Sequence, residues 1–209
     1  MVCQLAISLF KGVILLRNTY FEGETFEGLS VSEKIVNECE FIDCRFVNCS
    51  FENCQIVRCS FSECIFVNCT ISDLKSEYSE IKFMEFDECI LIGVDWGTLK
   101  PKGCFGNALH KVANCKMKYN TFSEMSLSKF DFATSSITGS MFAECNLTDS
   151  NFRKCDLRDT EFFKCDMRRA DFRGATGYKA DIFSCKMKAA RFSYPEVTGL
   201  LHCLEIKIE

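Results

Sequence analysis

The sequence has 209 residues and a formal net charge of −4, with 47% hydrophobic and 26% charged residues. This composition is ordinary for one substantial folded domain or two small ones, and it excludes a disordered or low-complexity chain. Sixteen cysteines would suggest a disulfide framework if the chain carried an export signal.

Residues 1–20 begin with an apolar segment, MVCQLAISLFKGVILL. It matches a secretory signal poorly, because no basic region precedes it, Lys11 interrupts it and no small-x-small cleavage site follows. It is also shorter than the ~20 apolar residues that span a bilayer. We therefore expect an N-terminal apolar cap without membrane association, and reduced thiols in the cytoplasm. A targeting role for this segment stays open as the alternative.

A period of five residues runs through nearly the whole remaining chain. Large apolar residues mark the centre of each repeat, first over residues 21–96 and, after a phase shift of one residue, over residues 112–192. Residues 97–111, GTLKPKGCFGNALHK, interrupt the period between the two repeat blocks. This interruption predicts either a projecting loop of functional importance or a packed kink.

The position two residues before the centre holds a small side chain in most repeats. Thirteen of the sixteen cysteines occupy it, seven of them in succession from Cys39 to Cys69, and serine, threonine or alanine alternates with cysteine there between residues 135 and 190. The position therefore selects small size rather than sulfur, because a free cysteine behaves as a small hydrophobe. The C-x4-C spacing lacks the C-x-x-C and cysteine–histidine pairs of metal sites. We expect no metal, no cofactor and no catalytic residue.

A period of five fits neither an α-helix, around which the apolar residues would spread, nor a straight strand, on which they would alternate between faces. It fits a chain that bends once per repeat and points each centre, and the residue two before it, inward. Successive coils would then stack ~4.8 Å apart by backbone hydrogen bonds. The spacing predicts an all-β solenoid and leaves three or four bends per coil open. The period misses at Ser76 and Gly177.

Residues 144–175, ECNLTDSNFRKCDLRDTEFFKCDMRRADFRGA, contain a recurring triplet at Cys155-Asp156-Leu157, Cys165-Asp166-Met167 and Ala170-Asp171-Phe172. These triplets resemble the consensus of the pentapeptide-repeat family, and the resemblance extends over roughly residues 21–192. It implies a right-handed quadrilateral β-helix with four repeats per coil, in which residues twenty apart stack. Two core ladders are then expected, Phe26, Phe46, Phe66 and Phe86, and Phe132, Phe152, Phe172 and Phe192.

Residues 193–209 abandon the period. The spacing of Ser193 and Glu196 and the position of Pro195 predict a short C-terminal helix from about Pro195 to Cys203, and the alternation in LEIKIE predicts a terminal strand. Such a segment would cover the end of the solenoid and join two copies about a twofold axis. The predicted dimer interface consists of Val197, Leu200, Leu201, Leu204, Ile206 and Ile208.

The helix and strand of this tail resemble the topoisomerase-interacting branch of the family, which includes Qnr-type quinolone-resistance proteins and the immunity proteins against albicidin and microcin B17. DECILIGVDWGTL (87–99) and DIFSCKMKAARFSYPE (181–196) are similar to the albicidin-immunity type. The resemblance implies a homodimeric DNA mimic that binds DNA gyrase or topoisomerase IV and protects it from an antibiotic or toxin. It implies no enzymatic activity and no direct nucleic-acid binding. A structural interaction scaffold with an unrelated partner is the alternative.

Charge is distributed unevenly along the chain. The first 100 residues carry 16 acidic and 8 basic side chains, whereas the remaining residues carry 13 acidic and 17 basic ones. With four repeats per coil, as the resemblance implies, one acidic strip carries Glu22, Glu40, Asp43, Glu63 and Glu80 with Lys82, and a second carries Glu24, Glu27, Glu85, Asp87 and Glu88 with Arg45. These strips are therefore the better candidates for contact with a basic enzyme surface, and the basic second block argues against mimicry along the whole chain. The candidate topoisomerase contacts are Glu22, Glu40, Asp43, Glu63, Glu80, Glu85, Asp87, Glu88 and, in the interruption, Lys100, Lys102 and Phe105.

Overall fold

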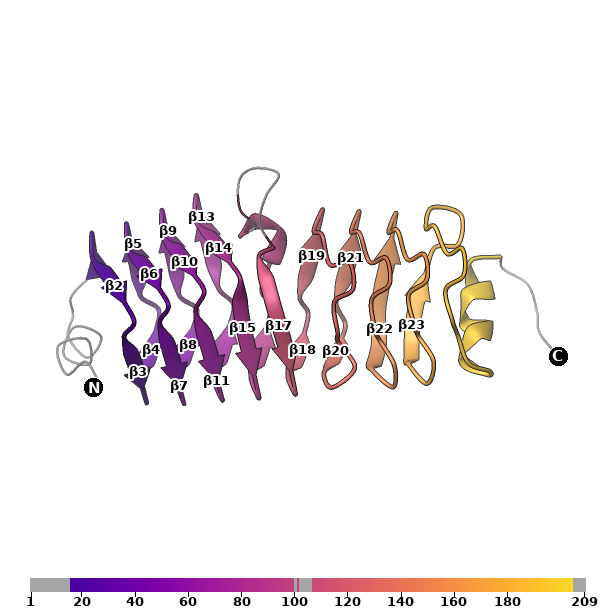
Figure 1. Ribbon diagram of the computed structural model, residues 1–209, viewed down its shortest axis with the longest axis horizontal. Helices are drawn as coiled ribbons and strands as arrows, with labels where there is room; N and C mark the ends of the chain where they lie inside the picture. Colours follow the sequence, from indigo (N-terminus) through magenta and orange to yellow (C-terminus); the bar gives the residue numbers. More distant parts are fainter. Residues whose placement is uncertain (1–15, 100, 102–106, 205–209) are drawn as a thin grey trace. The chain divides into compact units, whose positions relative to one another are not determined.

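The computed structural model describes residues 16–99, 101 and 107–204, and the chain divides into two compact units, Met1–Lys116 and Met117–Glu209. Each unit is built from short parallel strands that wind in successive coils (Figure 1). No described helix has the length and apolarity needed to cross a membrane.

The first unit consists of three- to five-residue strands, except for its two-residue first strand, and one 3₁₀ helix. Its elements are β1 (Leu16–Arg17), β2 (Tyr20–Glu22), β3 (Thr25–Glu27), β4 (Ser30–Ser32), β5 (Ile35–Asn37), β6 (Glu40–Ile42), β7 (Arg45–Val47), β8 (Ser50–Glu52), β9 (Gln55–Val57), β10 (Ser60–Ser62), β11 (Ile65–Val67), β12 (Thr70–Ser72), β13 (Lys75–Glu77), β14 (Glu80–Lys82), β15 (Met84–Asp87), β16 (Ile90–Ile92), η1 (Trp96–Thr98) and β17 (Leu109–Ala113).

The second unit continues with strands and ends in a second 3₁₀ helix. Its elements are β18 (Lys116–Lys118), which begins at the boundary, β19 (Thr121–Ser123), β20 (Ser136–Thr138), β21 (Met141–Ala143), β22 (Asp156–Phe163), β23 (Thr176–Ala180) and η2 (Glu196–Leu204).

Strands twenty residues apart pair in parallel, so four repeats complete one coil. In the first unit Phe61 lies opposite both Phe41 and Ile81. The pairing produces four sheets, β1-β5-β9-β13, β2-β6-β10-β14, β3-β7-β11-β15-β17 and β4-β8-β12-β16. The second unit keeps the same register, because Phe142 lies opposite both Phe122 and Phe162. The predicted quadrilateral β-helix is therefore confirmed, and the choice between three and four bends is settled.

A left-handed backbone residue makes each corner. Every fifth residue from Asn18 to Gly93 has a positive φ, and the same spacing returns from Tyr119 to Gly174 with one exception at Thr134. The corner residue keeps its place in the hydrogen-bond ladder, since the N–H of Asp43 donates to the carbonyl of Ser62 in the next coil at 3.0 Å. Asparagine, aspartate and glycine adopt this conformation at the lowest cost, which explains their recurrence two residues after the centre.

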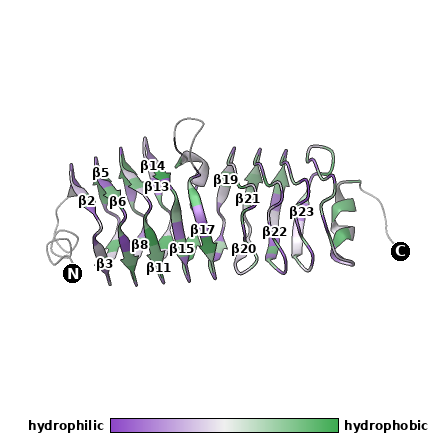
Figure 2. Cartoon of the chain, viewed as in Figure 1, coloured by the Kyte–Doolittle hydropathy of each residue, from purple (hydrophilic) through white to green (hydrophobic). Residues whose placement is uncertain are grey.

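The core consists of stacked inward side chains, as the period predicts. In the first unit the rings of Phe26, Phe46, Phe66 and Phe86 stack with centroid distances of 4.8, 4.5 and 5.2 Å. In the second unit Phe132, Phe152, Phe172 and Phe192 stack at 4.8, 4.8 and 5.3 Å. Both predicted ladders are therefore confirmed. Hydrophobic and hydrophilic residues follow one another along the strands of each unit (Figure 2), because outward positions flank every buried centre.

After the interruption the chain returns to the sheets of the first unit. Trp96 and Leu99 are buried, and β17 returns to the sheet by pairing with β15. The register between these two strands shifts by one residue at Met84 and Glu85, which accounts for the phase shift between the repeat blocks. At the start of the unit, β1 already pairs with β5, so the solenoid includes the end of the segment predicted as a cap.

Two features of the second unit differ from the simple repeat. Where Gly177 misses the centre, Tyr178 is buried instead and packs against Phe172 with a ring centroid distance of 5.6 Å. The predicted C-terminal helix is present but is a 3₁₀ helix, and the N–H of Thr198 donates to the carbonyl of Pro195 three residues earlier. The β-branched Val197 and Thr198, followed by Gly199, favour an α-helix poorly, which agrees with the tighter winding.

Replacing Ala189 by glycine is expected to stabilise the protein by about 1 kcal/mol. Ala189 is exposed and holds a corner with a φ of +62°, a conformation that only glycine adopts without steric cost. Urea denaturation of the full chain measures the change in the free energy of unfolding.

Ala143→Gly is the matched control, because Ala143 lies in the extended strand β21 of the same unit. Here the same substitution should destabilise by about 0.5–1 kcal/mol. Equal effects of the same sign at both positions would contradict the role assigned to the left-handed corner.

Candidate functional site: charged outward faces of the two units

Outward positions carry the functional chemistry in this fold, because the inward positions are used for packing. Each repeat presents the two neighbours of its centre and its corner residue on the surface. Side chains twenty residues apart then form columns along a sheet. The charged residues therefore gather into faces whose composition follows directly from the register.

An acidic face covers the sheet β2-β6-β10-β14 of the first unit. It consists of five exposed carboxylates, Glu22, Glu40, Asp43, Glu63 and Glu80. Lys82 is the only basic residue in these four strands. None of the five carboxylates forms an ion pair with another described residue, although Glu22 accepts a hydrogen bond of 2.7 Å from the Tyr20 hydroxyl. The structure thus brings together the five residues that the sequence assigned to one face.

The charge density of this acidic face is comparable to that of one DNA strand. Four strands spaced about 4.8 Å apart span about 14 Å, so five carboxylates supply roughly one charge per 3 Å. A single strand of DNA carries one charge per about 3.4 Å. The face can therefore present a basic partner with a field similar in strength to that of a phosphate backbone.

Of the second predicted acidic strip, Glu27 lies in β3, and Glu85, Asp87 and Glu88 lie in or directly after β15, beside the last strand β17 of the same sheet. Lys111 of β17 binds Asp87 at 3.2 Å, and the Asn114 amide donates to the same carboxylate at 2.9 Å. The hydrogen bond from Asn114, followed by Lys111, lowers the pKa of Asp87. His110 lies 3.8 Å from Glu85. This end of the sheet is therefore partly neutralised, which sequence reasoning missed.

The remaining predicted contacts, Lys100, Lys102 and Phe105, lie outside the described residues. The described candidate topoisomerase contacts are therefore all carboxylates.

The second unit has two adjacent faces rich in basic residues, which we call the basic faces. They follow the columns through Asp166 and Asp171, where Arg168 and Arg173 bind the aspartate two residues earlier, each at 2.6 Å. Arg169 binds Asp149 of the preceding coil at 2.7 Å. These arginines lower the pKa of their aspartate partners. The further exposed cations on these faces are Lys129, Arg153, Lys154, Lys186, Lys188 and Arg191.

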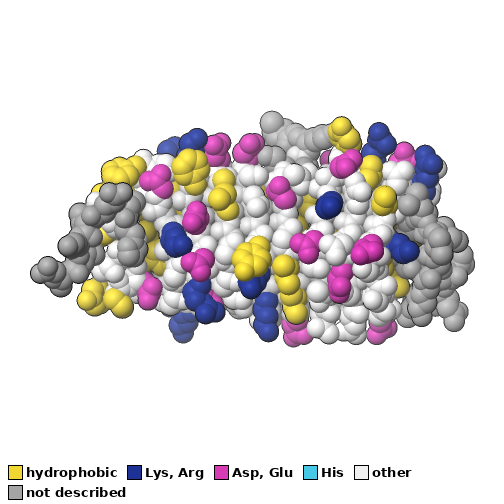
Figure 3. Space-filling view, turned by 180° about the vertical axis from the view of Figure 1, so that it is seen from behind, with side chains coloured by type: hydrophobic (Ala, Val, Ile, Leu, Met, Phe, Trp, Pro, Cys, Tyr) yellow, Lys and Arg dark blue, Asp and Glu magenta, His cyan; other side chains and the backbone are white. Residues whose placement is uncertain are grey.

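Acidic, basic and apolar side chains are interspersed on the side of the molecule in Figure 3. A single sign of charge is thus a property of particular faces and does not extend over the surface. For this reason the acidic face and the basic faces are treated as separate candidate sites.

The 3₁₀ winding of η2 divides the predicted apolar stripe into two rows. With three residues per turn, Val197 and Leu200 lie in one row, and Leu201 and Leu204 lie in another. Leu200 is buried and η2 packs against β23, whereas Leu204 is 38% exposed. The predicted interface residues Ile206 and Ile208 lie outside the described residues. Val197 and Leu201 are both partly exposed, so the row of Leu201 and Leu204 is the more exposed of the two.

The thirteen cysteines whose side chains the structure describes are buried free thiols that take part in backbone hydrogen bonding. The Cys44 thiol donates to the carbonyls of Phe21 and Ile42 at 3.6 and 3.4 Å. Thr160 holds an equivalent position, and its hydroxyl donates to the Ile137 carbonyl at 2.7 Å. Burial raises the pKa of Cys155 to about 12, which keeps this thiol protonated at neutral pH. A protonated buried thiol is neither a nucleophile nor a metal ligand. Hydrogen bonds from Cys59 and Cys165 lower the pKa of Cys39 and Cys185 to about 7, so burial rather than protonation shields these two thiols.

No group of histidine, cysteine, aspartate or glutamate suited to a metal ion occurs in the part of the chain that the structure describes. The small inward position thus accepts any short side chain, and a hydrogen-bonding one gains a carbonyl partner. The geometry provides binding surfaces and no assembled catalytic site among the described residues.

Comparison with protein families identifies the repeat. A family described as pentapeptide repeat region matches residues 110–182, and a family described as pentapeptide repeats (8 copies) matches residues 37–73. The two matches together cover more than half of the chain. No curated protein sequence gives a significant match.

Solved structures with the same fold include two of similar length. One is a trypsin-treated form of QnrB1, a plasmid-mediated fluoroquinolone resistance protein, with 17% identity, a TM-score of 0.56 and coverage of 92% of this chain and 98% of that chain. The other is HetL from the cyanobacterium Nostoc sp. strain PCC 7120, involved in heterocyst differentiation regulation. It has 12% identity, a TM-score of 0.54 and coverage of 91% and 92%.

Thiol titration with an aromatic disulfide at pH 8 is expected to leave the described cysteines unmodified in the native protein. Thirteen thiols are buried, so no more than the three others among the sixteen should react before unfolding. All sixteen should react in denaturant. Rapid native reaction at any position from Cys39 to Cys69, located by mass spectrometry, would contradict the packing role.

Proposed function

The chain belongs to the pentapeptide-repeat family, and we propose that it is a binding protein of this family that engages a type II topoisomerase. Its partner in this proposal is DNA gyrase or topoisomerase IV in the cytoplasm. By occupying the DNA-binding surface of the enzyme, it protects the enzyme from an antibiotic or toxin. The proposed role requires no catalysis by this chain.

The acidic face of the first unit is the observation that carries the proposal. Its five carboxylates are exposed, close together and without ion pairs among the described residues. A surface that binds DNA is basic, so such a face is attracted to it and accelerates association at low ionic strength. Because the strands hold the carboxylates in a fixed array, little side-chain and backbone ordering is needed on binding.

The comparisons support the fold that this proposal requires. QnrB1 is a fluoroquinolone resistance protein and HetL is involved in heterocyst differentiation regulation, so the same fold serves different roles. The choice between such roles therefore depends on the outward residues of this chain. Five carboxylates at the linear density of a DNA strand favour a partner whose natural ligand is DNA.

The proposal includes a homodimer formed through the C-terminal segment. Leu201 and Leu204 form the row of η2 that the packing against β23 leaves more exposed. Two such rows from two copies can bury each other about a twofold axis.

A scaffold for an anionic partner is the second candidate function, and the basic faces of the second unit favour it. Lys186, Lys188 and Arg191 are exposed and form no ion pair with a described residue. A partner that recognised this surface would carry the opposite charge from a DNA-binding enzyme surface. The two candidates thus require different faces of the protein.

Reversing charge on the acidic face is expected to weaken topoisomerase binding at least about tenfold, since each lost attraction at a desolvated contact contributes about 1 kcal/mol or more. The test compares wild type with Glu40→Lys/Glu63→Lys, which changes one strand position and one corner. Binding to purified gyrase and to topoisomerase IV is measured by titration at several salt concentrations, and protection by supercoiling or decatenation assays with an inhibitor.

The matched control is Glu33→Lys/Glu52→Lys, which changes one corner and one strand position at the sheet β4-β8-β12-β16. Its net charge equals that of the test variant, so it separates the acidic face from total charge. Equal binding by both variants would reject this face. Absence of wild-type binding to either enzyme would reject the topoisomerase role in favour of the scaffold.

Leu201→Asp/Leu204→Asp is expected to convert the dimer into a monomer, because charge would have to be buried in the apolar interface. Light scattering at micromolar concentrations measures the molar mass, and circular dichroism verifies that the coils remain folded. A folded variant that stays dimeric would place the interface elsewhere. Phe163→Asp/Phe183→Asp is the matched control, because it adds the same two charges at exposed apolar side chains of the second unit that lie outside η2.

A further inference from the structure

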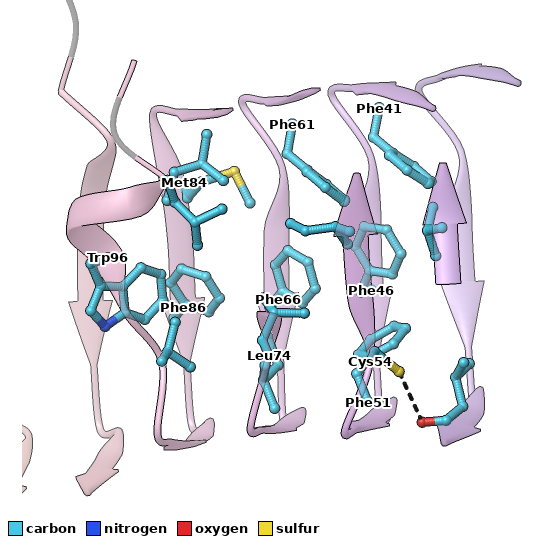
Figure 4. A pocket seen from close by; sticks show the side chains of 17 residues that line it. Phe41, Phe46, Phe51, Cys54, Phe61, Phe66, Leu74, Met84, Phe86 and Trp96 are labelled. Carbon is cyan, nitrogen blue, oxygen red and sulfur yellow. Dashed lines mark hydrogen bonds between the residues drawn. The ribbon is translucent and has the colours of Figure 1, made fainter. Parts of the chain in front are cut away.

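An apolar cavity of about 80 Å³ lies inside the coils of the first unit. Its lining side chains are aliphatic, aromatic or sulfur-containing, and they include Phe51, Cys54, Phe61, Leu74 and Trp96 (Figure 4). The Cys54 thiol already donates to the carbonyl of Val31 at 3.5 Å. The lining therefore offers no free polar group to a guest molecule.

An exchange of side-chain sizes within one repeat accounts for the cavity. In the seven preceding repeats, from Cys39 to Cys69, a cysteine stands two positions before a large centre, but Leu74 and Ser76 exchange these sizes. Ser76 lies opposite Ile56 of the preceding coil, and its short side chain binds the Thr98 hydroxyl at 2.7 Å. An aliphatic side chain at position 76 would fill the space beside Ile56. Leu74, which lies two residues earlier at the position that is usually small, fills this space only in part.

Two neighbouring aromatic side chains keep accessible surface because this volume is not filled. Phe61 stands between Phe41 and Ile81 in its sheet, and both of these neighbours are buried to within 4% exposure. Phe61 itself remains only half-buried, although it points into the coil. Phe51 behaves in the same way between the buried Val31 and Ile71. Both rings line the cavity, so the accessible surface they retain is interior surface.

We propose that this cavity is a binding site for a small apolar molecule of about the size of a xenon atom. Water gains little there, because it would find none of the hydrogen-bond partners that it needs. An apolar guest gains dispersion contacts with walls that otherwise lack a packing partner. Cavities of about 150 Å³ hold benzene, so a volume near half of that admits xenon or a molecule of three or four heavy atoms and excludes benzene.

Xenon titration of the full chain, followed by methyl NMR, tests the proposal. Saturable shifts are expected for the lining methyl groups of Val31, Ile56 and Ile71, with none for Leu127, Leu147 or Leu157 of the second unit. Benzene should give no saturable shift in wild type. Shifts that rise linearly and equally in both units would show nonspecific uptake, and absence of shifts in the first unit would overturn the site.

Two variants change the volume in opposite directions. Cys54→Leu places a leucine where the next coil already has Leu74, and it is expected to abolish the xenon shifts. Leu74→Ala enlarges the cavity by about three carbon atoms, and it is expected to admit benzene. Unchanged xenon shifts in a folded Cys54→Leu variant would overturn the assignment.

Cys145→Met is the matched control for the larger side chain. It adds volume at a small position of the second unit, where the preceding coil already carries Met125. Xenon shifts in the first unit should remain as in wild type. Circular dichroism of each variant establishes that a lost shift reflects filled volume, and loss of the shifts in this control as well would overturn the site.

Discussion

A left-handed turn of the backbone at every fifth residue is the constraint on which the rest of the structure depends. It bends the chain without removing the corner residue from the hydrogen-bond ladder, as the bond from Asp43 to Ser62 illustrates. Four such bends return the chain to the same sheet after twenty residues. The stacking of phenylalanine rings, the burial of the thiols and the columns of outward charge all follow from this one register.

Sequence periodicity predicted the solenoid, and the resemblance to the pentapeptide-repeat family supplied the four repeats per coil. The ladders through Phe46 and Phe152 follow from a five-residue period and four repeats per coil, because each repeat is positioned only by its neighbours. Departures from the period were not predictable in the same way. Tyr178 replaces a missed centre through a local shift, and Lys111 reaches Asp87 only after the interruption has changed the register. The miss at Gly177 and the interruption were visible in the sequence, but the residue that fills the core and the partner of Lys111 were not.

The candidate site was predictable to the extent that it follows the register. Glu40 and Glu80 fall on one face because they are forty residues apart, and the sequence placed them there. The neutralisation of Asp87 by Lys111 depends on β17, which pairs with β15 only after the interruption. The cavity depends on which of two inward side chains, Leu74 or Ser76, is larger, and side-chain volume is not part of a binary pattern. Long-range register and packing volume therefore account for most of what the sequence left undetermined.

The division of each repeat into inward and outward positions also bears on how such a protein can change over generations. Two of every five residues hold the coil together, and the remaining three contact solvent in most repeats. Selection can alter these three without repacking the interior, so a partner can be gained, lost or exchanged through single surface substitutions. Lineages that share this architecture are thus free to diverge widely in sequence and in biological role while the winding of the chain stays the same.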